Sequence, residues 1–179
     1  MKTQVWAHRG ASAYAPENTL EAFELAVSQG ADGVELDIQL SRDGELVVAH
    51  DETIDRVSNG TGYIKDYTLA QLKKLSFNRL FPDFKDARIP TLKEVYELLK
   101  PSGLTVNVEL KTGIILYPEI EEKVLALTAS MGMEDRVIYS SFCHPSLVRL
   151  KELDSGLKTG LLYSDGWIDA AAYGRHTVG

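Results

Sequence analysis

The sequence predicts an α/β fold of parallel strands, either an α/β barrel or a doubly wound sheet. Short apolar runs alternate along the chain with amphipathic segments that begin at helix-capping residues, which is the order of repeated βα units. Histidine, acidic and basic side chains stand at or just beyond the ends of several of these runs. No Gly-x-Gly-x-x-Gly turn follows the first run, which weighs against the dinucleotide-binding form of a doubly wound sheet.

The first unit is a short strand at 5–7 followed by a helix. Asn18 is the expected N-cap of this helix, and Glu21 at the third position completes a capping box. The helix is expected to end near Gly30. Its inward face is expected to carry three apolar side chains, Leu20, Phe23 and Val27.

The second unit begins with a regular strand pattern. Over 34–40, apolar residues alternate with polar ones that include Glu35 and Asp37, so the acids lie on the face opposite the apolar side chains. A turn at 42–44 leads into a second apolar run at 46–49. Because the gap is too short for a crossover helix, the two runs are expected to form an antiparallel hairpin.

Residues 51–90 lack the βα pattern and are expected to form an insertion after the second strand. They contain a Gly-rich turn at 59–62 and a short capped helix from Thr68. Three aromatic side chains follow: Phe77, Phe81 and Phe84. Long loops in compact folds are usually functional, so we expect this segment to cover the mouth of a site.

The βα order resumes at Thr91, which forms a capping box with Glu94 at the start of a helix. Pro118 opens another helix. The remaining expected elements are strands at 104–111, 137–141 and 160–163 and a helix from Pro145. The hairpin aside, this gives five barrel strands, whereas a closed barrel has eight and about 250 residues.

Composition narrows the class of protein. The 179 residues include 19 basic and 26 acidic side chains, for a net charge of −7, and no basic stripe typical of nucleic-acid binding is visible. The apolar runs are far shorter than a membrane span. The N-terminus leads directly into the first expected strand, so we expect no signal peptide. Cys143 is the only cysteine, so no internal disulfide can form. We expect a single-domain cytoplasmic protein with no nucleic-acid partner and no stable membrane insertion; the sequence does not indicate its oligomeric state.

Three carboxylates form a candidate metal site. Glu35 and Asp37 are separated by roughly 6.6 Å along one face of their strand, and Glu109 lies on the polar face of the following barrel strand. Oxygen ligands alone favour Ca²⁺ or Mg²⁺ over Zn²⁺. The alternatives are an exposed polar face of an antiparallel sheet and a buried ion network of these acids with Arg9 and Lys111.

Two cations and two histidines complete the candidate site. Arg9 can bind two phosphate oxygens at once, and Lys111 supplies a point charge. His8 and His50 can exchange protons near neutral pH. Together with a metal, these groups are what hydrolysis of a phosphodiester needs. The alternative roles are a metal or carbonyl partner for His8 and a strand-end cap for His50.

Several stretches carry a family resemblance: AHRGASAYAPENTLEAF, GADGVELDIQLSRDGELVVAHDETIDRVSNGTG, IPTLKEVYELL and NVELK, with weaker agreement at VIYSSF and GLLY. Up to about Tyr163 the chain resembles the glycerophosphodiester phosphodiesterase family, within the phosphatidylinositol-phosphodiesterase-like TIM-barrel superfamily. The resemblance implies a TIM (β/α)8 barrel with a small insertion at 51–90 and three strands beyond the five found. We therefore expect residues 1–179 to be one catalytic barrel domain that is incomplete at its C-terminal end; a short form completed by a partner chain is the alternative.

The resemblance also implies roles for the site residues. Three residues match the family's metal ligands: Glu35, Asp37 and Glu109. His8 and His50 match the catalytic pair, one activating the nucleophile and one protonating the leaving alcohol. Arg9 and Lys111 would bind the substrate, and Glu17 would help to orient the site, although Glu17 could equally mark a helix N-terminus.

The expected function is metal-dependent hydrolysis of glycerophosphodiesters to sn-glycerol 3-phosphate and an alcohol, in lipid and glycerol metabolism. One alternative is a lysophospholipase D-type hydrolase, in which the phenylalanines of 51–90 would form an acyl groove. Another is a non-catalytic phosphodiester-binding domain, which would keep the cations but would not need both histidines.

Overall fold

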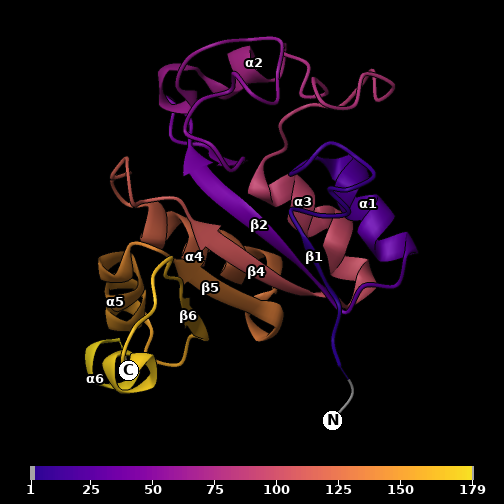
Figure 1. Ribbon diagram of the computed structural model, residues 1–179. Coiled ribbons are helices and arrows are strands. Elements are labelled where there is room, and N and C mark those ends of the chain that lie inside the picture. The colour runs from indigo at the N-terminus through magenta and orange to yellow at the C-terminus, as the bar shows by residue number, and fades with distance from the viewer. Residues whose placement is uncertain (1–2, 179) are drawn as a thin grey trace.

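Five strands lie side by side and run parallel in the computed structural model, which describes residues 3–178 (Figure 1). In spatial order they are β1 (Trp6–His8), β2 (Gly33–Leu40), β4 (Thr105–Leu110), β5 (Val137–Ser141) and β6 (Thr159–Leu161). The spatial order follows the chain order without a reversal, which is the winding of a barrel and not of a doubly wound sheet. The α/β class predicted from the sequence is confirmed.

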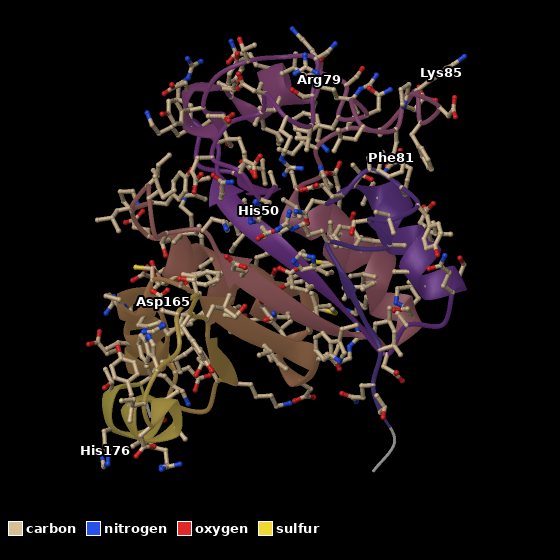
Figure 2. The ribbon with its side chains drawn as sticks, viewed as in Figure 1. His50, Arg79, Phe81, Lys85, Asp165 and His176 are labelled. Atoms are coloured by element: carbon tan, nitrogen blue, oxygen red, sulfur yellow. The ribbon has the colours of Figure 1, made fainter. Side chains whose placement is uncertain are left out.

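The remaining strand, β3 (Leu46–Val48), pairs antiparallel with the end of β2, as the short gap between them predicts. The two strands form the expected hairpin around a turn at Gly44, where φ is +79°. This hairpin carries the chain back to the level of Asp37, whose carbonyl accepts a hydrogen bond of 3.0 Å from the amide of Ala49. The next residue, His50, therefore stands beside β2 (Figure 2).

Helices cover one face of the sheet. They are α1 (Leu20–Ser28), α3 (Leu92–Leu99), α4 (Ile120–Met131) and α5 (His144–Leu153), and α6 (Ala170–Thr177) follows β6. Val34, Leu36 and Ile38 of β2 are fully buried against this helical layer in one continuous apolar core. The alternation predicted for this strand is confirmed, since the side chains of the intervening acids lie on the opposite face.

The start of α1 differs from the prediction. Thr19, and not Asn18, is its N-cap, because the Thr19 side chain accepts the hydrogen bond from the amide of Ala22. Asn18 has a left-handed backbone with φ of 56°, and its side chain turns away from the helix toward Asp37. Val27, expected on the inward face, is 36% exposed; the helix instead buries small residues beside Phe23.

The segment at 51–90 lies above the carboxyl end of β2, at the top of Figure 1. It has a small apolar cluster of its own with contributions from β3 and the chain just after it, formed by Val47, Ala49, Ile54, Ile64, Leu72, Phe77 and Ile89. The short helix predicted from Thr68 is present as α2 (Leu69–Leu72), with a complete capping box between Thr68 and Gln71. The segment therefore has internal packing that does not depend on the main core.

Candidate active site

The three predicted metal ligands converge on one face of the neighbouring strands β2 and β4. Glu35 and Asp37 lie two residues apart on β2, and Glu109 on β4 is the direct register partner of Asp37. One carboxylate oxygen from each lies within 4.8 Å of the others. The Asp37 side chain is 1% exposed and that of Glu35 is 12% exposed. The strand pattern and the parallel register are together sufficient to bring the three acids into one group.

The electrostatics of this group favour a cation. Burial, followed by the charge on Asp37, raises the pKa of Glu35 to about 8, and the same two causes raise the pKa of Glu109. Two buried oxygens of this group, Glu35 Oε1 and Asp37 Oδ1, have no hydrogen-bond partner among the described residues. A divalent ion with oxygen ligands fits these orphaned atoms and would relieve the repulsion between the carboxylates.

Arg9 and Lys111 stand beside the acids. The Lys111 ammonium donates a hydrogen bond of 3.0 Å to Glu109, and the Arg9 guanidinium lies 3.6 Å from Asp37. Both cations thus contact the acidic group, as the ion-network alternative requires. Lys111 Nζ also lies 3.9 Å from the Asp37 Oδ1 that lacks a hydrogen bond, whereas Glu35 Oε1 has neither a hydrogen bond nor an ion pair among the described residues, so an ion network alone does not account for the site. Two partly buried cations next to an oxygen-lined cation site can hold the oxygens of a phosphodiester.

His8 is the last residue of β1 and the register partner of Glu35 on β2. Its Nε2 lies 3.8 Å from Glu35 Oε2. Partial desolvation of the ring and the charge on Arg9 lower the pKa of His8, so the imidazole is neutral at neutral pH. A neutral ring at this place can accept a proton.

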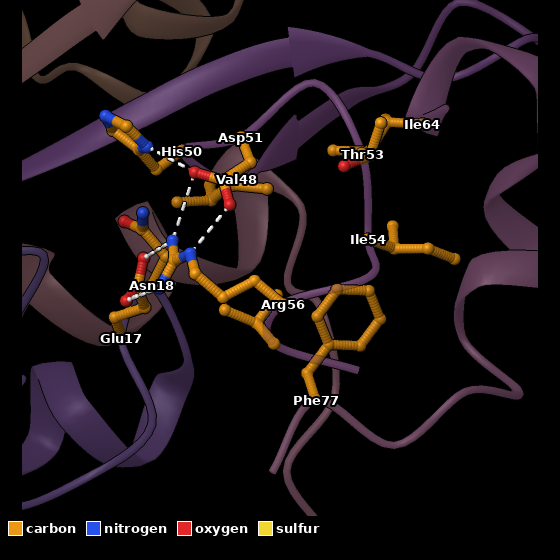
Figure 3. A pocket seen from close by; sticks show the side chains of 12 residues that line it. Glu17, Asn18, Val48, His50, Asp51, Thr53, Ile54, Arg56, Ile64 and Phe77 are labelled. Carbon is orange, nitrogen blue, oxygen red and sulfur yellow. Dashed lines mark hydrogen bonds and ion pairs between the residues drawn. The ribbon is translucent and has the colours of Figure 1, made fainter. Parts of the chain in front are cut away.

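His50 is oriented by its neighbour. Its Nδ1 lies 2.6 Å from Asp51 Oδ1 (Figure 3). Hydrogen bonds from Arg56 hold the pKa of Asp51 near 2, so Asp51 is ionised and can only accept. The proton of a neutral His50 therefore resides on Nδ1, and Nε2 is the nitrogen free to exchange protons with a substrate.

Three residues of the site had no role in the sequence-based prediction of its chemistry. The Asn18 side chain donates a hydrogen bond of 2.8 Å to Asp37 Oδ2, which fixes the orientation of that ligand. Asp51 and Arg56 form the support of His50 just described. The adjacency of His50 and Asp51 was a usable signal; Asn18 was interpreted only as a helix cap, and nothing local marked Arg56.

Glu17 is also in the site. Its Oε1 accepts a hydrogen bond of 3.1 Å from Arg9 Nη1, and Arg56 donates to both of its oxygens. Burial of Glu17 opposes ionisation, but these two arginines outweigh it and lower its pKa. The carboxylate is therefore charged and holds both guanidinium groups.

The sheet winding, the acidic group and the flanking cations and histidines define an enzyme of the α/β-barrel phosphodiesterase class. The chain belongs to the glycerophosphoryl diester phosphodiesterase family, whose model matches residues 8–175. A glycerophosphodiester phosphodiesterase of Caldanaerobacter subterraneus subsp. tengcongensis is 52% identical over 170 residues, which cover 94% of this chain and 70% of that relative. One of Bacillus altitudinis is 44% identical over 165 residues, covering 91% of this chain and 67% of the relative.

Solved structures agree with this assignment. The crystal structure of a glycerophosphodiester phosphodiesterase from Agrobacterium tumefaciens matches with a TM-score of 0.81 and 37% identity, covering 88% of this chain and 66% of that one. A phosphodiesterase of Oleispira antarctica, solved in complex with the product sn-glycerol-3-phosphate, matches with a TM-score of 0.85 and 33% identity, covering 98% of this chain and 72% of that one. This chain thus spans about two thirds of the length of its relatives. Among residues 3–178, no helix is long and apolar enough to cross a membrane.

Proposed function

We propose that this chain hydrolyses glycerophosphodiesters to sn-glycerol 3-phosphate and an alcohol, with Ca²⁺ or Mg²⁺ bound by Glu35, Asp37 and Glu109. The observation that carries the proposal is the convergence of these three carboxylates, two of which have a buried oxygen without a hydrogen-bond partner among the described residues. A bound divalent ion would neutralise the phosphodiester charge and polarise its P–O bonds. The cytoplasmic location expected from the sequence stays a prediction.

Arg9 and Lys111 bind the non-bridging phosphate oxygens in this proposal. The two side chains approach from both sides of Asp37, with separations of 3.6 Å for Arg9 Nε and 3.9 Å for Lys111 Nζ. Their ends are held by Glu17 and Glu109, respectively, so little side-chain freedom is lost when the substrate binds. Pre-oriented cations of this kind stabilise the charge that develops on the phosphate oxygens.

His8 and His50 divide the proton transfers. A neutral imidazole accepts the proton of the attacking water as the water oxygen bonds to phosphorus. An imidazolium donates its proton to the alcohol oxygen as the P–O bond to the leaving group breaks. The His8 ring lies 3.8 Å from Glu35, and the His50 ring is hydrogen-bonded to Asp51.

The product-bound relative from Oleispira antarctica supports sn-glycerol 3-phosphate as the product. The phenylalanines at 51–90 do not favour the lysophospholipase alternative. Phe77 is only 4% exposed and belongs to the small apolar cluster of that segment, and Phe81 packs edge-on against Phe84 with ring centres 6.2 Å apart. Phe77 and Phe81 also line a pocket beside Glu17, but that pocket is too small to hold an acyl chain.

The test compares kcat/KM for glycerophosphocholine and lysophosphatidylcholine, the latter below its micelle-forming concentration, with saturating Ca²⁺ or Mg²⁺. We expect a clear preference for glycerophosphocholine, because a glycerophosphodiester needs mainly the metal site and the cations for binding. A lysolipid would gain binding free energy, about 0.8 kcal/mol per methylene, only if its acyl chain were buried in an apolar groove. Preference for the acylated substrate would overturn the proposal. Turnover of neither substrate would favour the non-catalytic alternative.

A further inference from the structure

Arg56 joins two carboxylates that come from distant parts of the chain. Its Nη1 and Nη2 donate hydrogen bonds of 2.7 and 2.8 Å to the two oxygens of Glu17. Its Nε and Nη2 donate bonds of 2.7 and 3.1 Å to the two oxygens of Asp51 (Figure 3). One planar guanidinium thus binds both carboxylates in a bidentate manner, a geometry that a lysine ammonium cannot reproduce.

Each of these carboxylates also holds a residue of the proposed mechanism. Glu17 accepts a hydrogen bond of 3.1 Å from Arg9, and Asp51 lies 2.6 Å from the Nδ1 of His50. A continuous chain of contacts therefore runs from Arg9 through Glu17, Arg56 and Asp51 to His50. It connects the loop after β1 with the end of the β2–β3 hairpin.

We infer that Arg56 is a positioning residue that fixes the tautomer and orientation of His50 and the placement of Arg9 at the same time. The functional meaning of both effects depends on the proposed function. Without the guanidinium, Asp51 and Glu17 would be two partly buried carboxylates that have lost their shared cation, and their negative charges would repel each other. Asp51 would then turn toward solvent and would no longer accept the hydrogen bond that keeps the proton of His50 on Nδ1. Glu17 would no longer hold Arg9 in one orientation.

The alternative is that Arg56 serves only to attach the segment at 51–90 to the rest of the protein. Other contacts already do so. The Gln39 side chain donates hydrogen bonds of 2.9 and 2.7 Å to the carbonyls of Ala49 and Asp51, and the segment has its own apolar cluster. An attachment role would change stability without changing the tautomer of His50, so the two roles make different predictions.

The experiment compares Arg56→Met, which keeps the apolar stem, and Arg56→Lys, which keeps the charge, with Arg79→Met as the matched control. Arg79 lies in the same segment and is exposed, and its guanidinium donates to the carbonyl of Asp55 (Figure 2). Among the described residues its side chain bonds neither Glu17 nor Asp51, so the control removes an arginine from the same segment without removing a bond to either carboxylate. Nitrogen NMR of the histidine rings at pH 8, without metal or substrate, reports the tautomer of His50, whose signals are identified by their loss in His50→Gln.

We expect the parent chain and Arg79→Met to carry the His50 proton on Nδ1 and both Arg56 variants to show a mixture of tautomers. We also expect kcat for glycerophosphocholine to fall about 10–100-fold in Arg56→Met, with partial recovery in Arg56→Lys. An unchanged His50 tautomer in a folded Arg56 variant would overturn the inference; if Arg56→Met fails to fold, Arg56→Lys decides it. Because the NMR measurement needs no turnover, it tests Arg56 even if the proposed hydrolysis proves wrong.

Discussion

Asp37 and Glu109 are direct register partners on neighbouring parallel strands, and this pairing assembles the candidate metal site. Partners across a parallel ladder project to the same face, so the carboxylate of β4 is placed beside the two carboxylates of β2. A slip of one residue would move Glu109 to the helix-covered face, where the apolar core lies. The register of β2 and β4 thus determines the chemistry as well as the packing.

Replacing Glu35 by Gln removes the carboxylate that would bind the ion, with little change of shape. We expect the affinity for Ca²⁺ or Mg²⁺ to fall at least about tenfold, equivalent to about 1.4 kcal/mol, and turnover to fall with it. Titration calorimetry measures the affinity. Glu24→Gln, an exposed acid of α1, is the control and should bind the ion as the parent chain does. Full metal affinity and full turnover in Glu35→Gln would remove Glu35 from the site.

The two histidines should be separately required for proton transfer. His8→Gln and His50→Gln are each expected to lower kcat roughly 10²-fold or more, with the fold and metal binding retained. Steady-state kinetics on glycerophosphocholine provide the measurement. A variant with near-normal turnover would show that its histidine has no part in the reaction, and water or the substrate would then supply the second proton carrier.

Divalent-ion binding should release a proton. Since the pKa of Glu35 is raised to about 8, mainly by burial and by Asp37, most of the metal-free protein carries a proton on Glu35 at pH 7. A metal ligand must be deprotonated, so calorimetry in buffers of different ionisation enthalpy should detect proton release at pH 7 and tighter binding toward pH 8. Binding without proton release would contradict the electrostatic account of Glu35.

The same shift affects the stability of the metal-free protein. A carboxyl whose folded pKa is raised from its ordinary 4.5 to about 8 binds more protons when folded than when unfolded across that window. Its contribution to the free energy of unfolding is complete below pH 4.5 and is lost as the pH rises toward 8. Urea unfolding should therefore show a steeper loss of stability over this range in the parent chain than in Glu35→Gln.

The side chain of Asn18 should matter for metal binding, and its left-handed backbone conformation should matter for stability. Asn18→Gly tolerates the φ of 56° but removes the hydrogen bond to Asp37, so we expect weaker metal binding with a modest change in stability. Asn18→Ala removes the same bond and adds a left-handed backbone penalty of about 1–2 kcal/mol. Urea unfolding separates the variants. Equal stability of the two would show that the left-handed conformation is not maintained.

Local patterns predicted the features that depend on neighbouring residues. The capping box of α3 is an example: the Thr91 hydroxyl accepts from the amide of Glu94, and the Glu94 carboxylate accepts from the amide of Thr91. The alternation of β2 likewise places Glu35 and Asp37 on one face. Propensity and side-chain period determine such features, and both are readable from the sequence.

Features that depend on distant contacts were beyond such patterns. The bonds between Arg56 and Glu17 join residues 39 positions apart, across a segment without regular periodicity. Asn18 has the residue type and spacing of a helix cap, and only the packing of the loop against β2 turns its side chain to Asp37. The correct cap, Thr19, is the adjacent residue, and local capping preference does not separate the two.

The central claim is that the acidic group binds a divalent ion which the hydrolysis requires. The most direct measurement is the formation of sn-glycerol 3-phosphate from glycerophosphocholine by the metal-stripped chain, before and after addition of Ca²⁺ or Mg²⁺. We expect no product above background without the ion, restored turnover once it is added to the parent chain, and little or no restoration in Glu35→Gln. Equal product formation in the presence of excess chelator would contradict the account.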